Sequence, residues 1–290
     1  MRGMMAMAAM VCGAALGAPQ PALAWGDEAH AIIALVAEHY LDPAVHDQVM
    51  ALLATDKDKL TKHDIASEAT WADHYRDSDI RTTKKRYNAT YWWHLVYTGQ
   101  PCTGRSDAPR GVNASTGPAK DCVVTKINQF AAELAEPSTP PKERLVALKF
   151  LLNLVGDVND PLHDSDNQGA LTMKVTADGF KAGTLAHLWE VDLVARNGTD
   201  AHAIAAQWIP AITDADSRAW QQGAPENWSQ QGFELARDHC YKPLPPPDAK
   251  GVYHLEPAYI DDASSVVNLQ LHKAGLRLAK TLNKALAKTS

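Results

Sequence analysis

Aspartates and histidines placed among apolar side chains are the residues of this 290-residue sequence best suited to chemistry. Asp157 lies one helical turn after Asn153 on an otherwise apolar helix, and a carboxylate in that setting must be paired or bound to a metal. Gly156 leaves room for a ligand or another backbone, and Pro161 turns the chain so that His163 can face Asp157. Zinc takes nitrogen and oxygen ligands that converge from several helices, and this run supplies residues of the types that such a site needs.

Three further segments carry residues that could join this centre. His30 lies one turn into the first expected helix, although a lone histidine more often only lines a helix face. Asp73 and Arg76 can pair on one helical face, and taken alone this spacing indicates a surface ion pair. His94 follows two tryptophans and is expected in an apolar surrounding, where a core histidine is the alternative.

The segment 1–24 has the pattern of a secretory signal peptide. Arg2 precedes a short apolar run, which ends in Ala22-Leu23-Ala24 and is too short for a comfortable membrane span. Cleavage after Ala24 makes Trp25 the first residue, and its α-amine has a lone pair available near neutral pH for binding a metal. The alternative is a buried N-terminal helix. We therefore expect an exported protein, secreted or periplasmic, without a membrane span.

The charge balance limits the kinds of partner. A formal net charge of −6 argues against a duplex binder that holds phosphates through bulk positive charge. A chain of this charge that acts on nucleic acid needs metal ions to supply the positive field locally. The composition, 46% hydrophobic and 21% charged, is that of an ordinary globular protein.

Helical periodicity dominates the sequence after the signal segment and predicts one all-α, mainly helical domain over 25–290 with long loops. A short extended aromatic run is expected at 91–97, followed by a glycine-rich loop at 98–121. Cys102 and Cys122 bracket this loop and are expected to form a disulfide, which leaves Cys240 free or paired between chains. The expected helices are 29–41, 42–53, 64–75, 123–134, 142–158, 183–194, 201–209, 228–239 and 263–287.

Several short motifs, in a fixed order, resemble a known family. They are Trp25-Gly26 with His30, Trp71-Ala72-Asp73 with Arg76, Trp92-Trp93-His94, and Gly156-Asp157 with Pro161-Leu162-His163. This order is similar to that of the zinc-dependent, single-strand-preferring nucleases of the S-one/P-one type. The resemblance implies the all-α phospholipase C/nuclease-like fold and three zinc ions. It also implies hydrolysis of single-stranded DNA or RNA to 5′-nucleotides, with 3′-nucleotidase activity.

The resemblance further implies a ligand set for the three zinc ions, in which the carboxylate of Asp157 is shared between two of them. Trp25 contributes both its amine and its carbonyl oxygen. The expected ligands are Trp25, His30 and Asp157 for the first zinc, Asp73, His94, Asn153 and Asp157 for the second, and His163 and Glu190 for the third.

At three of the family's ligand positions this chain has a different residue. Asn153 and Ala186 stand where the family has histidine, and Glu190 stands where it has aspartate. An amide oxygen is a weaker zinc ligand than imidazole, and losses around a metal cost affinity and activity. His187 comes one position late but lies three residues before Glu190 and could share its face. We therefore expect between one and three bound zinc ions.

The resemblance also implies catalytic roles. Asp73 orients or deprotonates the attacking water, and Arg76 steadies both Asp73 and the developing negative charge. The expected substrate is single-stranded nucleic acid or nucleotides, and we expect a monomer that binds no membrane. Two alternatives stay open. One is a zinc-dependent phospholipase C, which shares the N-terminal tryptophan and the fold, and the other is a non-catalytic or impaired member with a partly lost zinc centre.

Overall fold

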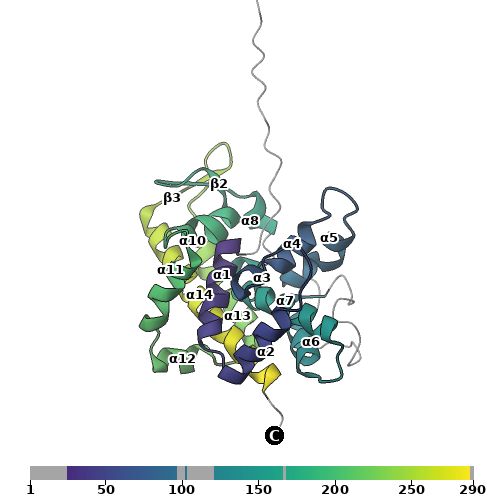
Figure 1. Cartoon of the computed structure of the whole chain (residues 1–290). Coiled ribbons are helices and arrows are strands. Elements are labelled where there is room, and N and C mark those ends of the chain that lie inside the picture. The colour runs from purple at the N-terminus through teal and green to yellow at the C-terminus, as the bar shows by residue number, and fades with distance from the viewer. Residues whose placement is uncertain (1–24, 97–101, 103–120, 166–167, 288–290) are drawn as a thin grey trace, which may run out of the picture.

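The computed structural model describes residues 25–96, 102, 121–165 and 168–287, and they form a mainly helical protein (Figure 1). The predicted signal segment and most of the predicted loop 98–121 lie outside these residues. The fold class predicted from the sequence is confirmed. The α-helices are α1 (Asp27–His39), α2 (Pro43–Leu53), α3 (Ile65–Glu68), α4 (Trp71–Asp77), α5 (Lys85–Thr90), α6 (Val123–Ala135), α7 (Pro141–Asp157), α8 (Gln168–Thr172), α9 (Leu185–His187), α10 (Leu193–Ala195), α11 (Ala201–Trp208), α12 (Asp214–Trp220), α13 (Pro225–Leu235) and α14 (Pro257–Leu286).

Short turns and a small sheet connect these helices. The 3₁₀ turns are η1 (Tyr91–His94), η2 (Pro161–Asp164) and η4 (Ile209–Ala211), and the π-helical turns are η3 (Leu188–Asp192) and η5 (Ala236–Tyr241). The strands are β1 (Lys174–Ala177), β2 (Gly183–Thr184) and β3 (Val252–Leu255). They pair in the order β2-β1-β3, with β2 antiparallel and β3 parallel to β1, at one end of the molecule (Figure 1).

Several segments differ from the sequence prediction. The helix predicted at 64–75 is divided into α3 and α4, and the strands β1 and β3 and the helix α12 were not predicted. The run predicted as extended at 91–97 is wrong for residues 91–94, which form η1, and the backbone becomes extended only at Leu95. The turn places Trp93 against Phe130 and Phe150, with ring centroids 6.0 and 5.3 Å away, and tertiary packing here outweighs the strand propensity of aromatic residues. The helix predicted at 183–194 is interrupted, because it begins with β2 and contains the π-helical turn η3.

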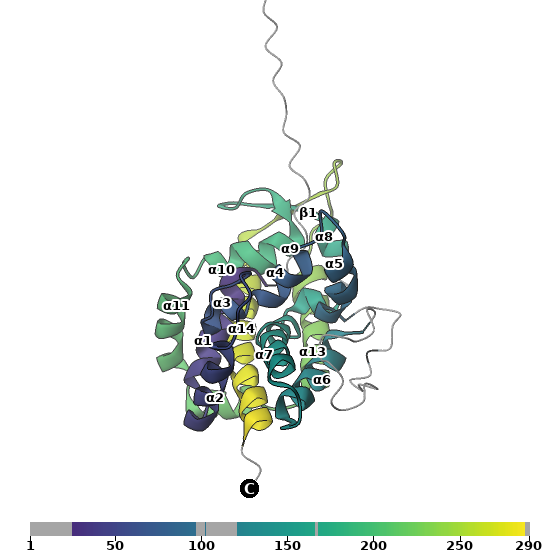
Figure 2. The same ribbon diagram turned by 45° about the vertical axis from the view of Figure 1, so that its right-hand side comes forward.

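Helix α7 lies at the centre of the fold. Every residue from Ala147 to Asp157 is buried, and α7 contacts α6, α14 and α1, with α14 lying along α1 (Figure 2). Gly275 on α14 permits this close approach, since a Cβ there would lie 2.5 Å from Val36 Cγ1 on α1. A helix that is covered all round can carry polar side chains only where its neighbours bring polar groups to meet them.

An aromatic cluster fixes α4 and η1 against α7. Phe130 of α6 stacks on Phe150 of α7 with centroids 4.7 Å apart, and Trp71 of α4 lies edge-on to Phe150 at 5.5 Å. Such ring pairs add to the burial of apolar area and favour defined orientations. The cluster therefore sets the direction of the two polar residues that follow it, Asp73 and His94.

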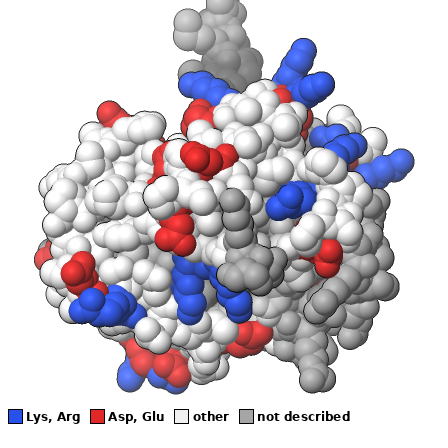
Figure 3. Space-filling view, turned by 60° about the horizontal axis from the view of Figure 1, so that its bottom comes forward, with Lys and Arg blue, Asp and Glu red and all other residues white. Residues whose placement is uncertain are grey.

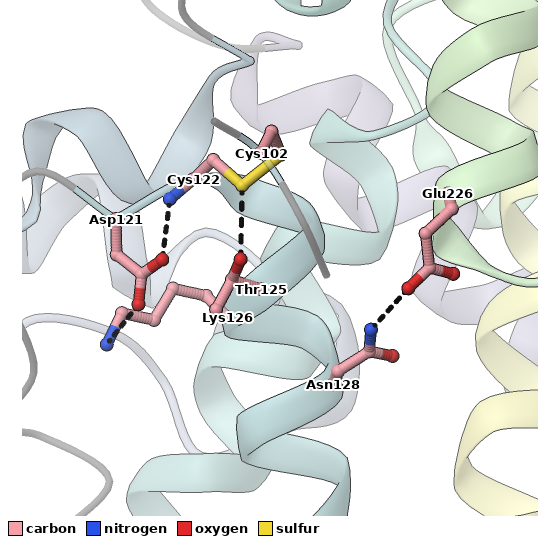
Figure 4. Close-up of a disulfide and its surroundings, with 7 residues drawn as sticks. All are labelled: Cys102, Asp121, Cys122, Thr125, Lys126, Asn128 and Glu226. Atoms are coloured by element: carbon pink, nitrogen blue, oxygen red, sulfur yellow. Dashed lines mark hydrogen bonds and ion pairs between the residues drawn. A yellow bond between two sulfur atoms is a disulfide. The ribbon is translucent and has the colours of Figure 1, made fainter. Parts of the chain in front are cut away.

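The predicted disulfide is confirmed, because Cys102 and Cys122 are joined with their Cα atoms 5.7 Å apart (Figure 4). Cys122 directly precedes α6, and its backbone N–H donates to Asp121 Oδ1 over 3.0 Å. Cys240 is a free, buried cysteine. Within the described residues, none of the helices combines the length and the apolar character needed to cross a bilayer.

Candidate metal centre

The last turn of α7 carries the centre of the candidate site. Asp157 is fully buried, with its carboxylate 2.8 Å from His94 Nδ1 and 3.4 Å from His30 Nε2. Gly156 allows the imidazole of His30 to lie this close to α7, because a Cβ at that position would be 2.8 Å from His30 Nδ1. The predicted roles of Gly156 in close approach and of Asp157 in pairing both fit this geometry.

The electrostatics of this contact favour an ionised carboxylate. Burial alone would raise the pKa of Asp157, but the hydrogen bonds from His30 and His94 and the charge on nearby imidazoles outweigh burial and lower it. Burial likewise lowers the pKa of His30, and the carboxylates of Asp157 and Asp73 reverse that effect and raise it. The site therefore stabilises positive charge beside Asp157.

Asp73 and Arg76 form a buried pair rather than the surface pair that their spacing alone indicates. Arg76 Nη1 donates to Asp73 Oδ1 over 2.7 Å, and the two side chains are only 2% and 3% exposed. Asn153 Nδ2 donates to the other oxygen, Asp73 Oδ2, over 2.7 Å, and also to the carbonyl oxygen of Ala69 over 3.0 Å. His30 Nε2 lies 3.5 Å from Asp73 Oδ2. Both carboxylate oxygens of Asp73 are thus fixed in direction.

A second group of polar side chains adjoins Asp157. The 3₁₀ turn η2 places His163 Nδ1 within 3.9 Å of Asp157 Oδ1, and the same nitrogen donates to the carbonyl oxygen of His94 over 2.8 Å. His163 Nε2 faces Glu190 Oε1 of η3 at 3.9 Å. The predicted turn at Pro161 therefore does bring His163 back toward Asp157.

Asp160 belongs to this group although the sequence prediction did not include it among the ligands. One ligand atom from each of Asp160, His163 and Glu190 lies within 4.8 Å of the other two, and all three side chains are buried. Burial raises the pKa of Asp160 to about 6, and burial together with neighbouring carboxylates raises that of Glu190 well above its ordinary value. No sequence signal marks Asp160 as part of this group, because its direction comes from the cap that it forms at η2.

The expectation that His187 shares a face with Glu190 is wrong. His187 is 55% exposed and its Nε2 lies 3.6 Å from Asp192 Oδ1, while Glu190 points into the protein. Residues three apart share a face in an α-helix, but in a π-helical turn the partner is five residues on, which here is Asp192. Ala186, at the place of a family histidine, is buried and offers no donor atom.

Trp25, which directly precedes Gly26 and α1, packs against the end of α7. Its indole Nε1 donates to the carbonyl oxygen of Gly156 over 3.1 Å, and the side chain is 1% exposed. The backbone N–H of Gly26 donates to the carbonyl oxygen of Glu190 over 3.1 Å. The start of the described chain is thus anchored both to the end of α7 and to η3.

The donor set fits zinc. Four buried carboxylates, Asp73, Asp157, Asp160 and Glu190, lie together, and within the described residues only Asp73 among them pairs with a lysine or arginine, namely Arg76, so a divalent cation would relieve their repulsion. Buried polar atoms are nearly always hydrogen-bonded, yet several here have no such partner, as expected of metal ligands. These atoms are His30 Nδ1, His94 Nε2, Asn153 Oδ1, Asp157 Oδ1, Asp160 Oδ2 and Glu190 Oε1.

A family model described as S1/P1 Nuclease matches residues 25–287, which is nearly the whole of the described chain. The chain belongs to the S1/P1 nuclease family. It is similar to Nuclease P1 of Penicillium citrinum, at 25% identity over 278 residues that cover 89% of this chain and 97% of that protein. It is also similar to Endonuclease 2 of Arabidopsis thaliana, at 25% identity with 90% of each chain covered, and to Nuclease S1 of Aspergillus oryzae, at 26% identity over 63% of this chain.

In this S1/P1 family member, the side chains predicted from the sequence converge on one buried region. They come from Trp25, from α1, α4, η1 and α7, and from η2 and η3 beyond α7. Their role as metal ligands or catalytic groups stays a prediction. The residues brought together are Trp25, His30, Asp73, Arg76, His94, Asn153, Asp157, His163 and Glu190.

Proposed function

We propose that this protein is an exported, zinc-dependent nuclease that hydrolyses phosphodiester bonds of single-stranded DNA or RNA to 5′-nucleotides, with 3′-nucleotidase activity. The observation that carries the proposal is the convergence on Asp157 of His30 and His94, at 3.4 and 2.8 Å, in a chain of a nuclease family. Export is supported by the basic and apolar pattern of residues 1–24 and by the family match, which begins at Trp25.

The residues present can hold zinc in the arrangement that the resemblance implies. Trp25, His30 and Asp157 would hold one ion, and Asp73, His94 and Asp157 would hold a second, with the unpartnered Asn153 Oδ1 as a further oxygen. His163 and Glu190 would hold a third. When bound, zinc supplies positive charge to the phosphate oxygens and lowers the pKa of bound water toward neutrality.

Asp73 is the residue best placed to direct the attacking water. Its carboxylate is held from both sides, at Oδ1 by Arg76 and at Oδ2 by Asn153, so that its lone pairs have fixed directions. A carboxylate in that position can orient the water and accept its proton. Arg76 also bonds Asp77 through Nε and Nη2, so its guanidinium is rigid and can stabilise charge that develops on the phosphate.

Surface charge supports local metal ions, rather than a basic field, as the means of holding phosphate. On the face drawn in Figure 3, Lys and Arg side chains alternate with Asp and Glu in small groups and form no continuous basic patch. With a net charge of −6, the chain has no excess of cations to attract a polyanion from a distance. The positive charge for the scissile phosphate would therefore come from the buried centre.

The test compares the wild-type protein with Asp73→Asn on single-stranded DNA, measuring release of 5′-nucleotides. We expect turnover to fall by about 100-fold or more, since a general base is lost. Asp47→Asn, at an aspartate 87% exposed on α2, is the matched control and should keep full activity. Hydrolysis unchanged by Asp73→Asn would contradict the proposal.

A phospholipase assay and a nucleotide-binding measurement, made beside the nuclease assay, separate the two alternatives. Release of phosphocholine from phosphatidylcholine without release of nucleotides would identify a zinc-dependent phospholipase C. Binding of nucleotides without their hydrolysis would identify an impaired member, for which Asn153 and the buried Ala186 are the structural reason.

A further inference from the structure

We propose that Asp160 takes the place of the missing histidine at Ala186, so that Asp160, His163 and Glu190 form a rebuilt site for a divalent metal ion such as zinc. The inference deepens the proposed function and rests on it in one respect, namely that the centre binds divalent ions. Asp160 is absent from the ligand set that the family resemblance implies. Its assignment comes from the contacts of this chain alone.

The first argument is the fixed direction of the Asp160 carboxylate. Asp160 is 0% exposed, and its Oδ1 accepts the backbone N–H of Leu162 over 2.9 Å at the start of η2. This bond pins one oxygen and leaves the other, Oδ2, buried without a hydrogen-bond partner. A buried, unpartnered carboxylate oxygen is costly unless a cation binds it.

The second argument is the tautomer of His163. Its Nδ1 must donate, because the carbonyl oxygen of His94 at 2.8 Å can only accept. Nε2 is then the nitrogen whose lone pair is available, and it faces Glu190 Oε1, which also has no hydrogen-bond partner. A backbone carbonyl that orients a ligand histidine in this way is a usual feature around metal sites.

The third argument is the spacing of the group. One ligand atom from each residue lies within 4.8 Å of the other two. Ligands about 2.1 Å from a tetrahedral zinc are about 3.4 Å apart, so the group has to contract by at most about 1.4 Å to bind the ion. Two carboxylates and one neutral imidazole also carry a charge that a divalent cation balances.

The family pattern has a histidine at position 186, where this chain has Ala186, and we infer that Asp160 supplies the missing third ligand. Ala186 has no donor atom, and His187 turns outward to Asp192, so η3 contributes only Glu190. Asp160, the residue that caps η2 three positions before His163, lies within 4.8 Å of both His163 and Glu190. A site that lost an imidazole from one element thus gains a carboxylate from another.

The other group of potential ligands in the described residues already contains a cation. Asp56, His63 and Glu68 also lie close together, but the buried ammonium of Lys149 already bonds Asp56 and lies 3.7 Å from Glu68. That lysine supplies the positive charge which a metal would otherwise provide. No such cation contacts Asp160 or Glu190 among the contacts of the described chain.

The experiment counts metal ions by native mass spectrometry of the full mature protein in zinc, and measures affinity by competition with a chelator. Asp160→Asn should lose one zinc ion from the wild-type count or bind it about 10-fold or more weakly. Asn keeps an oxygen that can accept the Leu162 N–H, so the turn should still form. Asp164→Asn, equally buried on η2 but outside the group, is the matched control and should keep the wild-type count.

A rescue variant makes the assignment specific. Ala186→His in the Asp160→Asn background restores an imidazole at the family position and should recover the lost ion. A wild-type count and affinity in Asp160→Asn would overturn the inference and leave the proposed function intact. A wild-type protein that binds no zinc would overturn both, whereas zinc binding that depends on Asp160 without any nuclease activity would support the inference and refute the function.

Discussion

Asn153 stands where the family pattern has a histidine, and its amide orients the carboxylate of Asp73. Its Nδ2 donates to Asp73 Oδ2 and to the carbonyl oxygen of Ala69, over 2.7 and 3.0 Å, while its Oδ1 has no hydrogen-bond partner. An imidazole at this place would offer a stronger zinc ligand but could not make both donor bonds. Asn153 therefore holds the carboxylate of Asp73 in direction, and in the proposed zinc centre it would do so at the cost of metal affinity.

Asn153→His should accordingly strengthen zinc binding. We expect the affinity for the ion beside Asp73 and His94 to rise by about 10-fold or more, measured by chelator competition. In excess chelator the same variant should be about 1 kcal/mol less stable, because the bond to Ala69 is lost. Asn88→His, which adds an imidazole on the exposed face of α5, is the control, and equal zinc affinity in the two variants would show that position 153 does not contact metal.

Two glycines set the distances between the helices that carry the site. Gly156 lets His30 of α1 lie against α7, and Gly275 lets α14 lie against α1. A Cβ on Gly275 would lie 2.5 Å from Val36 Cγ1 and 3.2 Å from the carbonyl oxygen of Ile33. Because the second of these atoms is backbone, the contact cannot be relieved by a side-chain rotation alone.

Gly275→Ala should therefore destabilise the fold. Overpacking of a tight core contact costs about 1–3 kcal/mol, which exceeds the gain of about 1 kcal/mol from replacing glycine by alanine within a helix. Urea unfolding measures the difference, with the slope expected to stay constant. Gly183→Ala is the control, since its nearest contact would be an ordinary 3.7 Å. A Gly275→Ala protein more stable than the wild type would show that α1 and α14 can move apart at little cost in free energy.

At the level of elements, the sequence predicts most of the helices and the side chains that meet at α7. Apolar periodicity with a buried carboxylate is a local signal, so Asp157 and the helix that carries it could be found from the sequence. His187 and Asp160 could not be placed, because their directions depend on a π-helical turn and on a cap at η2 that no periodicity marks. Likewise, Arg76 is buried on α4, which packs against α7 far along the chain, and no local pattern marks that burial.

At the scale of the whole molecule, Trp25 and Gly26 bind to elements that lie far along the chain. Trp25 bonds Gly156 at the end of α7, and Gly26 bonds Glu190 in η3, so residues far apart in sequence meet at one place. Removal of residues 1–24, as the signal pattern predicts, would free the α-amine of Trp25, which the family resemblance implies as a ligand of the same zinc ion as His30 and Asp157. Processing and metal loading are then expected to be coupled.

A short extension ahead of Trp25 tests this coupling. A peptide bond removes the lone pair of the α-amine, so a chain beginning Gly-Ser-Trp25 should bind one zinc ion fewer, or bind it about 10-fold or more weakly, than a chain beginning at Trp25. Native mass spectrometry of both proteins gives the count and the first residue together. The same two residues added after Ser290 form the control and should change nothing. Equal zinc counts in all three proteins would show that the amine is not a ligand, and would leave His30 and Asp157 to bind the first ion without it.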